Sequence, residues 1–178
     1  IDAVAGRVPV SIALGELIDK PRLDVPHADF VKVGLAHAPA DWRTRLTGRN
    51  LIAVAYGDHE RAGAPAVEDV IDFALHHDVA GVLIDTAVKD GRGLLHWCAD
   101  ELPRWIRIVQ DAGLSIALAG ALHGEAFDRT AAMGPNIIAV RGAACLDGER
   151  AATIDAKCIA SLKHRLSACT TSAAAPAG

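Results

Sequence analysis

The fold is indicated most clearly by the segment Leu83-Ile84-Asp85-Thr86-Ala87-Val88-Lys89-Asp90-Gly91, in which an apolar run ends abruptly in a carboxylate and an amine. The run is continuous rather than alternating, which is typical of a parallel strand buried on both faces. An upstream segment, Asp29-Phe30-Val31-Lys32-Val33-Gly34-Leu35, has a lysine inside a similar run. A lysine in a buried strand is costly unless it is paired or used. Together these segments predict an α/β fold with chemistry near its strand ends.

Six apolar runs of this kind recur, and segments with helical periodicity lie between them. The predicted strands are Val8 to Leu14, Phe30 to Leu35, Leu51 to Tyr56, Gly81 to Ala87, Ser115 to Leu122 and Ile137 to Ala143. The predicted helices include Pro65 to His77, a segment that begins after Asp100 as N-cap and ends at Gly113, and Ile154 to Leu166. This alternation predicts βα units and a parallel sheet.

The βα units predict a TIM (β/α)8 barrel, of which this chain represents about six units. Such barrels have about 250 residues, and the chain has 178 without an initiator methionine, so we expect an N-terminal part to be absent. The alternative is an open doubly wound sheet. The barrel is favoured because polar residues follow several different strands, where barrel active sites lie. We expect one partial barrel domain over residues 1–168 and a flexible tail over 169–178.

Composition excludes several classes of protein. The net charge is −4 and no basic stripe occurs, so nucleic acid is not an expected partner. No stretch has the roughly 18 to 20 apolar residues needed to span a bilayer, and no signal peptide opens the chain, so we expect a cytoplasmic protein without a membrane partner. The four cysteines form no CxxC pair, so neither disulfides nor a metal site is expected.

Lys32 is the first candidate catalytic residue. Val31 and Val33 should face the helices, so Lys32 shares the opposite face of its strand with Phe30 and Gly34. In a barrel that face is the interior. The alternative is a structural lysine that extends to an edge or binds a core carboxylate.

Asp85 and Lys89 form the second candidate group. Asp85 ends its predicted strand and Lys89 follows within one turn, so the two side chains can pair and shuttle protons. A salt bridge in a surface loop has the same spacing, and both interpretations remain open from the local sequence.

A phosphate site is predicted after the last two strands. Small residues there let backbone N–H groups approach an anion, as in barrels that bind phosphate after strands seven and eight. Arg141 adds a charge, although it can equally brace a carboxylate. The predicted phosphate-binding residues are Gly120, Ala121, Arg141, Gly142 and Ala143.

Other polar residues near strand ends are weaker candidates. Glu16 and Asp58 are more simply interpreted as solvated loop residues. His37 and His59 lie near predicted strand ends, but we expect no histidine to bind a metal.

The blocks around Lys32, Asp85 to Gly91, Ala117 to Gly120 and Val140 to Cys145 resemble the (5-formylfuran-3-yl)methyl phosphate synthase family, also called 4-(hydroxymethyl)-2-furancarboxaldehyde-phosphate synthase. The resemblance runs from about Val8 to Leu166. It implies a TIM barrel that condenses two molecules of glyceraldehyde 3-phosphate into a phosphorylated furan aldehyde, early in methanofuran biosynthesis. It maps the site onto the two lysines and the aspartate. The family's Schiff-base lysine in the first barrel strand has no counterpart in this sequence.

The resemblance implies a lyase that uses a lysine Schiff base and eliminates phosphate. We expect no cofactor, a triose phosphate as the small-molecule partner, and a homo-oligomer. Two alternatives remain open. One is another Schiff-base sugar-phosphate aldolase with Lys32 or Lys89 as nucleophile. The other is a catalytically degenerate barrel with a structural or regulatory role.

Overall fold

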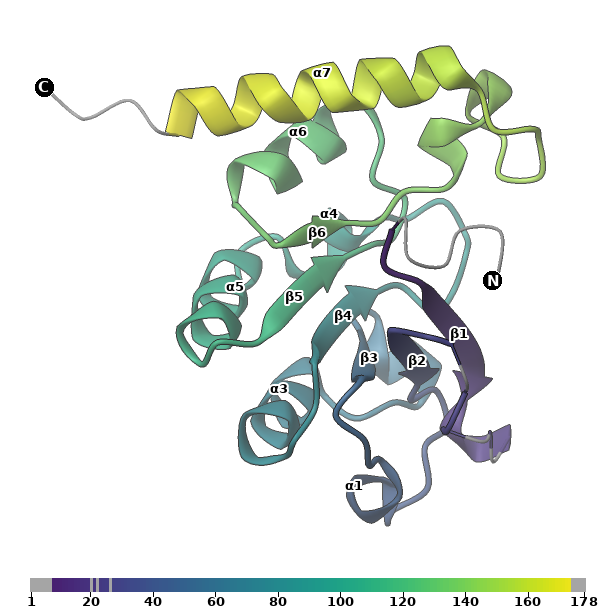
Figure 1. The fold of residues 1–178 in the computed structure, drawn as a ribbon, viewed down its shortest axis with the longest axis vertical. Helices are drawn as coiled ribbons and strands as arrows, with labels where there is room; N and C mark the ends of the chain where they lie inside the picture. Colours follow the sequence, from purple (N-terminus) through teal and green to yellow (C-terminus); the bar gives the residue numbers. More distant parts are fainter. Residues whose placement is uncertain (1–7, 20, 22, 26, 174–178) are drawn as a thin grey trace, which may run out of the picture.

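A computed structural model describes residues 8–173, except 20, 22 and 26. Within this part of the chain, six strands form one sheet in the order β1-β2-β3-β4-β5-β6, and every neighbouring pair is parallel. The strands are β1 (Ser11–Glu16), β2 (Phe30–Gly34), β3 (Leu51–Tyr56), β4 (Gly81–Asp85), β5 (Ser115–Leu118) and β6 (Ile137–Ile138). The fold is therefore α/β with a parallel sheet (Figure 1).

Helices connect most of the strands. The α-helices are α1 (Trp42–Arg45), α2 (His59–Ala62), α3 (Val67–His76), α4 (Leu94–Cys98), α5 (Leu102–Asp111), α6 (Gly124–Ala132) and α7 (Ala156–Ala173). Short 3-10 turns are η1 (Leu17–Asp19), η2 (Gly142–Ala144) and η3 (Leu146–Gly148). In Figure 1, α3 and α5 lie along one side of the sheet, and α7 crosses α6 near β6. No helix in the described ranges is both long and apolar enough to cross a membrane.

The main core lies between α3, α5 and one face of the sheet. Alternate strand residues point to this face because successive side chains of a strand alternate in direction. The strand residues buried there are Val31, Val33, Leu51, Ala53, Val82, Ile84, Ile116 and Leu118. Phe73 of α3 and Val109 of α5 are buried against them. Each large apolar side chain so buried stabilises the fold by about 1.5 to 3 kcal/mol.

The opposite face of the sheet, called the inner face below, carries the polar candidates. It holds a second, smaller apolar cluster of Val54, Tyr56, Ala62, Leu83 and Ala119. Lys32 and Asp85 alternate with outward-facing neighbours and therefore belong to this face. The sheet thus separates a packing face from a face that can carry chemistry.

The strand that contains Leu51 to Tyr56 is confirmed at both ends, whereas other strands are shorter than predicted. β4 ends at Asp85, and β5 ends at Leu118 because Gly120 takes a φ of +104°, which breaks the ladder. β6 covers only Ile137–Ile138, and residues 142–144 at the end of the predicted strand form a 3-10 turn instead. β1 is displaced toward the C-terminus of its prediction, starting at Ser11.

The helices also differ from their predictions. Glu101, not Asp100, precedes α5, and no side chain caps that helix by a hydrogen bond. Asp155 accepts hydrogen bonds from the backbone N–H groups of Lys157 and Cys158, at 2.8 and 2.9 Å, and so begins α7. α7 continues to Ala173, into the segment predicted as a tail. Residues 174–178 lie outside the described residues.

The sheet is open in the part of the chain that the structure describes, with β1 and β6 as its edges. Closure into a barrel is therefore not observed in these ranges. The strictly sequential strand order has no reversal, whereas a doubly wound sheet reverses its order at a switch point. The arrangement is that of consecutive βα units.

Candidate active site

Asp85 and Lys89 lie together at the carboxyl end of β4, as their spacing predicts. Lys89 Nζ is 3.1 Å from Asp85 Oδ1 and also donates to the Thr86 carbonyl oxygen. The same Asp85 oxygen accepts the Thr86 backbone N–H at 2.7 Å. The Lys89 side chain is 47% exposed and that of Asp85 26% exposed. The pair is therefore a partly solvated acid and amine that a small molecule can reach.

Asp58 holds the loop that carries this pair. Its side chain is buried, and its two oxygens accept the backbone N–H groups of Ala87 and Val88 at 2.7 and 3.0 Å. The prediction of a solvated loop residue is wrong, because burial of this carboxylate is compensated by two backbone donors. Asp58 is thus a structural anchor for the segment between Asp85 and Lys89.

The loop is anchored a second time beyond Lys89. Asp90 accepts hydrogen bonds from Arg92 and lies 3.0 Å from the guanidinium of Arg61 in α2. The hydrogen bonds from Arg92 hold the pKa of Asp90 well below its usual range, with a smaller contribution from Arg61. Asp90 therefore stays ionised and ties the loop to α2.

Lys32 lies on the inner face but not beside this pair. It is half-buried between its register partners Ala13 on β1 and Ile52 on β3. Asp85 is in register with Tyr56, four residues beyond Ile52, which is about 13 Å further along the strands. Among the described residues, Lys32 has neither a hydrogen-bond nor an ion-pair partner. The structure brings Asp85 and Lys89 together and leaves Lys32 deeper on the same face.

Two residues that sequence reasoning underrated meet on this face. Tyr56 Oη donates a hydrogen bond to Glu16 Oε1 at 2.6 Å, and Glu16 Oε2 accepts the backbone N–H of Ala36 at 2.8 Å. Glu16 is half-buried rather than a solvated loop residue. The available signal was that the chain's only tyrosine ends a buried strand, where its hydroxyl needs a partner.

Burial raises the pKa of Tyr56 far above its ordinary value, and the hydrogen bond to Glu16 raises it further. The negative charges of Glu16, Asp85 and Asp58 act in the same direction. Tyr56 therefore remains a protonated hydrogen-bond donor at any physiological pH.

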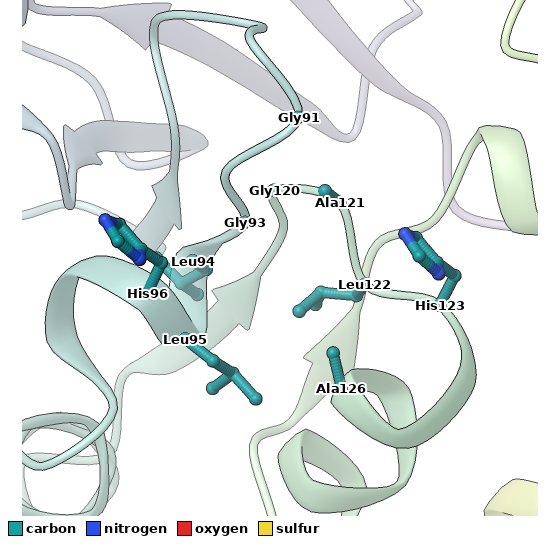
Figure 2. Close-up of a pocket in the computed structure, with 10 residues that line it drawn as sticks. All are labelled: Gly91, Gly93, Leu94, Leu95, His96, Gly120, Ala121, Leu122, His123 and Ala126. Carbon is teal, nitrogen blue, oxygen red and sulfur yellow. The ribbon is translucent and has the colours of Figure 1, made fainter.

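Three of the five predicted phosphate residues line pockets, and these three lie in two different pockets. Gly120 and Ala121 line a pocket of about 230 Å³ between α4 and α6, together with Gly91 and Gly93. Figure 2 shows Leu95 and Leu122 directed into this space, so its interior is apolar and its rim is rich in glycine. A glycine suits position 120 because any other residue would place a Cβ only 3.1 Å from the Thr86 methyl group. Only the rim is suited to an anion.

Ala143 lines a second pocket, of about 350 Å³, with Lys157 and Arg165 of α7. Arg165 is bound to Asp128 at 2.6 Å, which leaves Lys157 as the cation of this pocket without such a bond among the described residues. Arg141 and Gly142 line neither pocket. The structure therefore does not bring the five predicted phosphate residues into one site.

The sequence of the chain is similar to those of known proteins. A family model described as 4-HFC-P synthase matches residues 1–163. The (5-formylfuran-3-yl)methyl phosphate synthase of Methanosarcina barkeri is 28% identical over 174 residues, which cover 85% of this chain and 74% of that protein. The protein of that name from Methanococcus maripaludis is 34% identical over 166 residues, covering 79% and 69%. That from Methanothermobacter thermautotrophicus is 30% identical over 167 residues, covering 84% and 69%.

Proposed function

Because this chain belongs to the 4-HFC-P synthase family, a family of enzymes, we propose that it condenses two molecules of glyceraldehyde 3-phosphate into (5-formylfuran-3-yl)methyl phosphate. The product would serve methanofuran-type biosynthesis in the cytoplasm. Two triose phosphates contain the atoms of one phosphorylated furan aldehyde, one inorganic phosphate and two waters. The reaction therefore needs no oxidant and no reductant.

The Asp85–Lys89 pair is the observation that carries this proposal. A lysine amine condenses with the aldehyde of one triose and releases water, and the resulting iminium acidifies the neighbouring carbon. Asp85 or Lys89 accepts that proton, and the electron pair left on carbon expels phosphate. A partly exposed acid and amine 3.1 Å apart are suited to such transfers.

The second triose then adds through a carbon–carbon bond, and ring closure and aromatisation release two waters. Hydrolysis of the iminium consumes one water, frees the lysine and leaves the furan aldehyde. Lys32 has the position and charge to bind a phosphate or to stabilise the developing enolate from the inner face. The glycine-rich rim at Gly120 and Ala121 would hold the phosphate that the product keeps.

We propose further that the sheet is part of a (β/α)8 barrel. Sequential parallel strands, helices on one face and polar groups at the carboxyl ends of β1, β3 and β4 support this arrangement. In such a barrel, the two edge strands β1 and β6 would each pair with a further strand.

Two measurements test the proposed function. The purified full-length protein should release inorganic phosphate from glyceraldehyde 3-phosphate and form a furan detectable by its ultraviolet absorbance. Borohydride should trap the substrate covalently, and peptide mapping should identify the lysine. Trapping at Lys32 or Lys89 with another sugar phosphate, but not with glyceraldehyde 3-phosphate, would instead indicate a different aldolase. Absence of phosphate release would contradict the proposal.

A further inference from the structure

Glu16 and Tyr56 form a bridge across strand β2. Glu16 ends β1 and Tyr56 ends β3, and the two strands are not neighbours because β2 lies between them. Their side chains nevertheless meet at 2.6 Å above Gly34, the last residue of β2. We call this contact the Glu16–Tyr56 bridge.

Gly34 makes room for the bridge. A Cβ at this position would lie 2.2 Å and 2.4 Å from the two Glu16 carboxylate oxygens and 2.4 Å from Tyr56 Oη. The φ of Gly34 is not in the left-handed region, so space and not backbone conformation requires glycine. Glycine weakens a strand interior and is typical of places where another group approaches closely.

A bulge in β1 turns Glu16 toward the inner face. Ala13 is in register with Lys32, but Glu16, three residues later, is in register with Gly34, only two residues after Lys32. The extra residue lies beside Gly15, whose φ is +84°. Without it, Glu16 would point to the opposite face from Ala13. Bulges next to active sites commonly redirect a side chain in this way.

The bridge lies between the separate parts of the candidate site. Lys32 is two residues before Gly34 on the same face, which places the two Cα atoms about 7 Å apart. Tyr56 is in register with Asp85 on the neighbouring strand. Glu16 has no ion-pair partner among the described residues. Its negative charge is therefore available to attract an amine on the same face of the sheet, such as that of Lys32.

We propose that Glu16 and Tyr56 are positioning residues of this site: the bridge holds the Glu16 carboxylate on the face that carries Lys32, and it holds Tyr56 beside Asp85. This inference rests on the proposed function. Glu16 suits the task because it has two acceptor oxygens for two donors, Tyr56 Oη–H and Ala36 N–H. In a glutamine, an NH2 group that is itself a donor replaces one of these two oxygens, so one of the two donors would face another donor.

Phosphate release kinetics test the inference on the full chain. Tyr56→Phe removes only the hydroxyl and Glu16→Gln keeps the size of the side chain. Each should lower kcat by about 10- to 100-fold, the range expected when a reacting group is slightly misplaced, with KM changed less than about threefold. Because the two residues act as one unit, the double variant should be no slower than either single variant.

The control variant is Glu68→Gln, which makes the same chemical change on the exposed side of α3 and should leave kcat unchanged. Thermal unfolding of each variant separates misfolding from misplacement, and borohydride trapping reports whether substrate still binds. Normal kcat in Tyr56→Phe, or losses that multiply in the double variant, would overturn this inference but leave the proposed function in place. No phosphate release by the unsubstituted full-length protein would overturn the proposed function, and the inference with it.

Discussion

Polar side chains on the inner face differ in how each is stabilised. Asp58 is buried, but its oxygens accept hydrogen bonds from backbone N–H groups. Asp85 forms an ion pair with Lys89. Lys32 has neither kind of compensation within the described ranges. Since an uncompensated ammonium is unfavourable in a half-buried position, its presence is better explained by function than by stability.

Lys32→Met is the variant that tests this interpretation. It removes a charge without shortening the side chain much, so the free energy of unfolding should stay within about 1 kcal/mol or rise. Urea denaturation measures this, and phosphate release should fall sharply in the same protein. Destabilisation by more than about 2 kcal/mol would identify Lys32 as a structural lysine instead.

Lys89→Ala should give the same balance of effects at the other amine, with little change in stability and a large loss of activity. An ion pair with this much solvent exposure contributes at most about 1 kcal/mol, so the melting temperature should change little. Loss of a proton-transfer group should reduce phosphate release by about 100-fold or more. Lys163→Ala, on the exposed surface of α7, is the matched control. Near-normal turnover in Lys89→Ala would remove Lys89 from the mechanism.

At the level of the elements, sequence patterns predict contacts within a segment better than contacts between segments. Asp85 and Lys89 are four residues apart after an apolar run, so their pairing could be predicted from spacing alone. Glu16 and Tyr56 are 40 residues apart, and their meeting depends on a bulge and on the register of three strands. Neither is visible as a local pattern. The apolar runs marked the strands, but not the glycines and turns that end them early.

Gly34→Ala tests the packing of β2 beneath the bridge. A methyl group there overlaps three oxygens, and overpacking of this kind costs about 1 to 3 kcal/mol. The cost should be smaller in a Tyr56→Phe background, because one of the three oxygens is gone. Urea denaturation of the two single variants and the double variant measures the difference. Equal costs in both backgrounds would place the clash elsewhere.

At the level of the whole molecule, the two faces of the sheet differ in what they carry. One face is closed by α3 and α5 and holds the main apolar core, while the inner face holds the charged groups and a small apolar cluster. The sequence predicted the parallel α/β class from its continuous apolar runs. It could not fix the closure of the sheet, because closure depends on which edges pair and not on the composition of any strand.

Alkaline titration should report global unfolding through Tyr56. Its pKa is raised in the folded state, so above about pH 10, where an unfolded phenol ionises, protons are released on unfolding and stability falls as pH rises. Since Tyr56 is the chain's only tyrosine, phenolate absorbance should grow only together with loss of the helical circular dichroism signal. Ionisation well before that loss would contradict the buried, hydrogen-bonded phenol.

The sequential strand order also bears on how the protein acquires its structure. Each strand from β2 to β6 pairs with the strand just before it along the chain, so each of them finds a partner already synthesised. Loop closure between such near neighbours is cheaper in entropy than closure between distant segments. The sheet can therefore grow one unit at a time while the nascent chain leaves the ribosome.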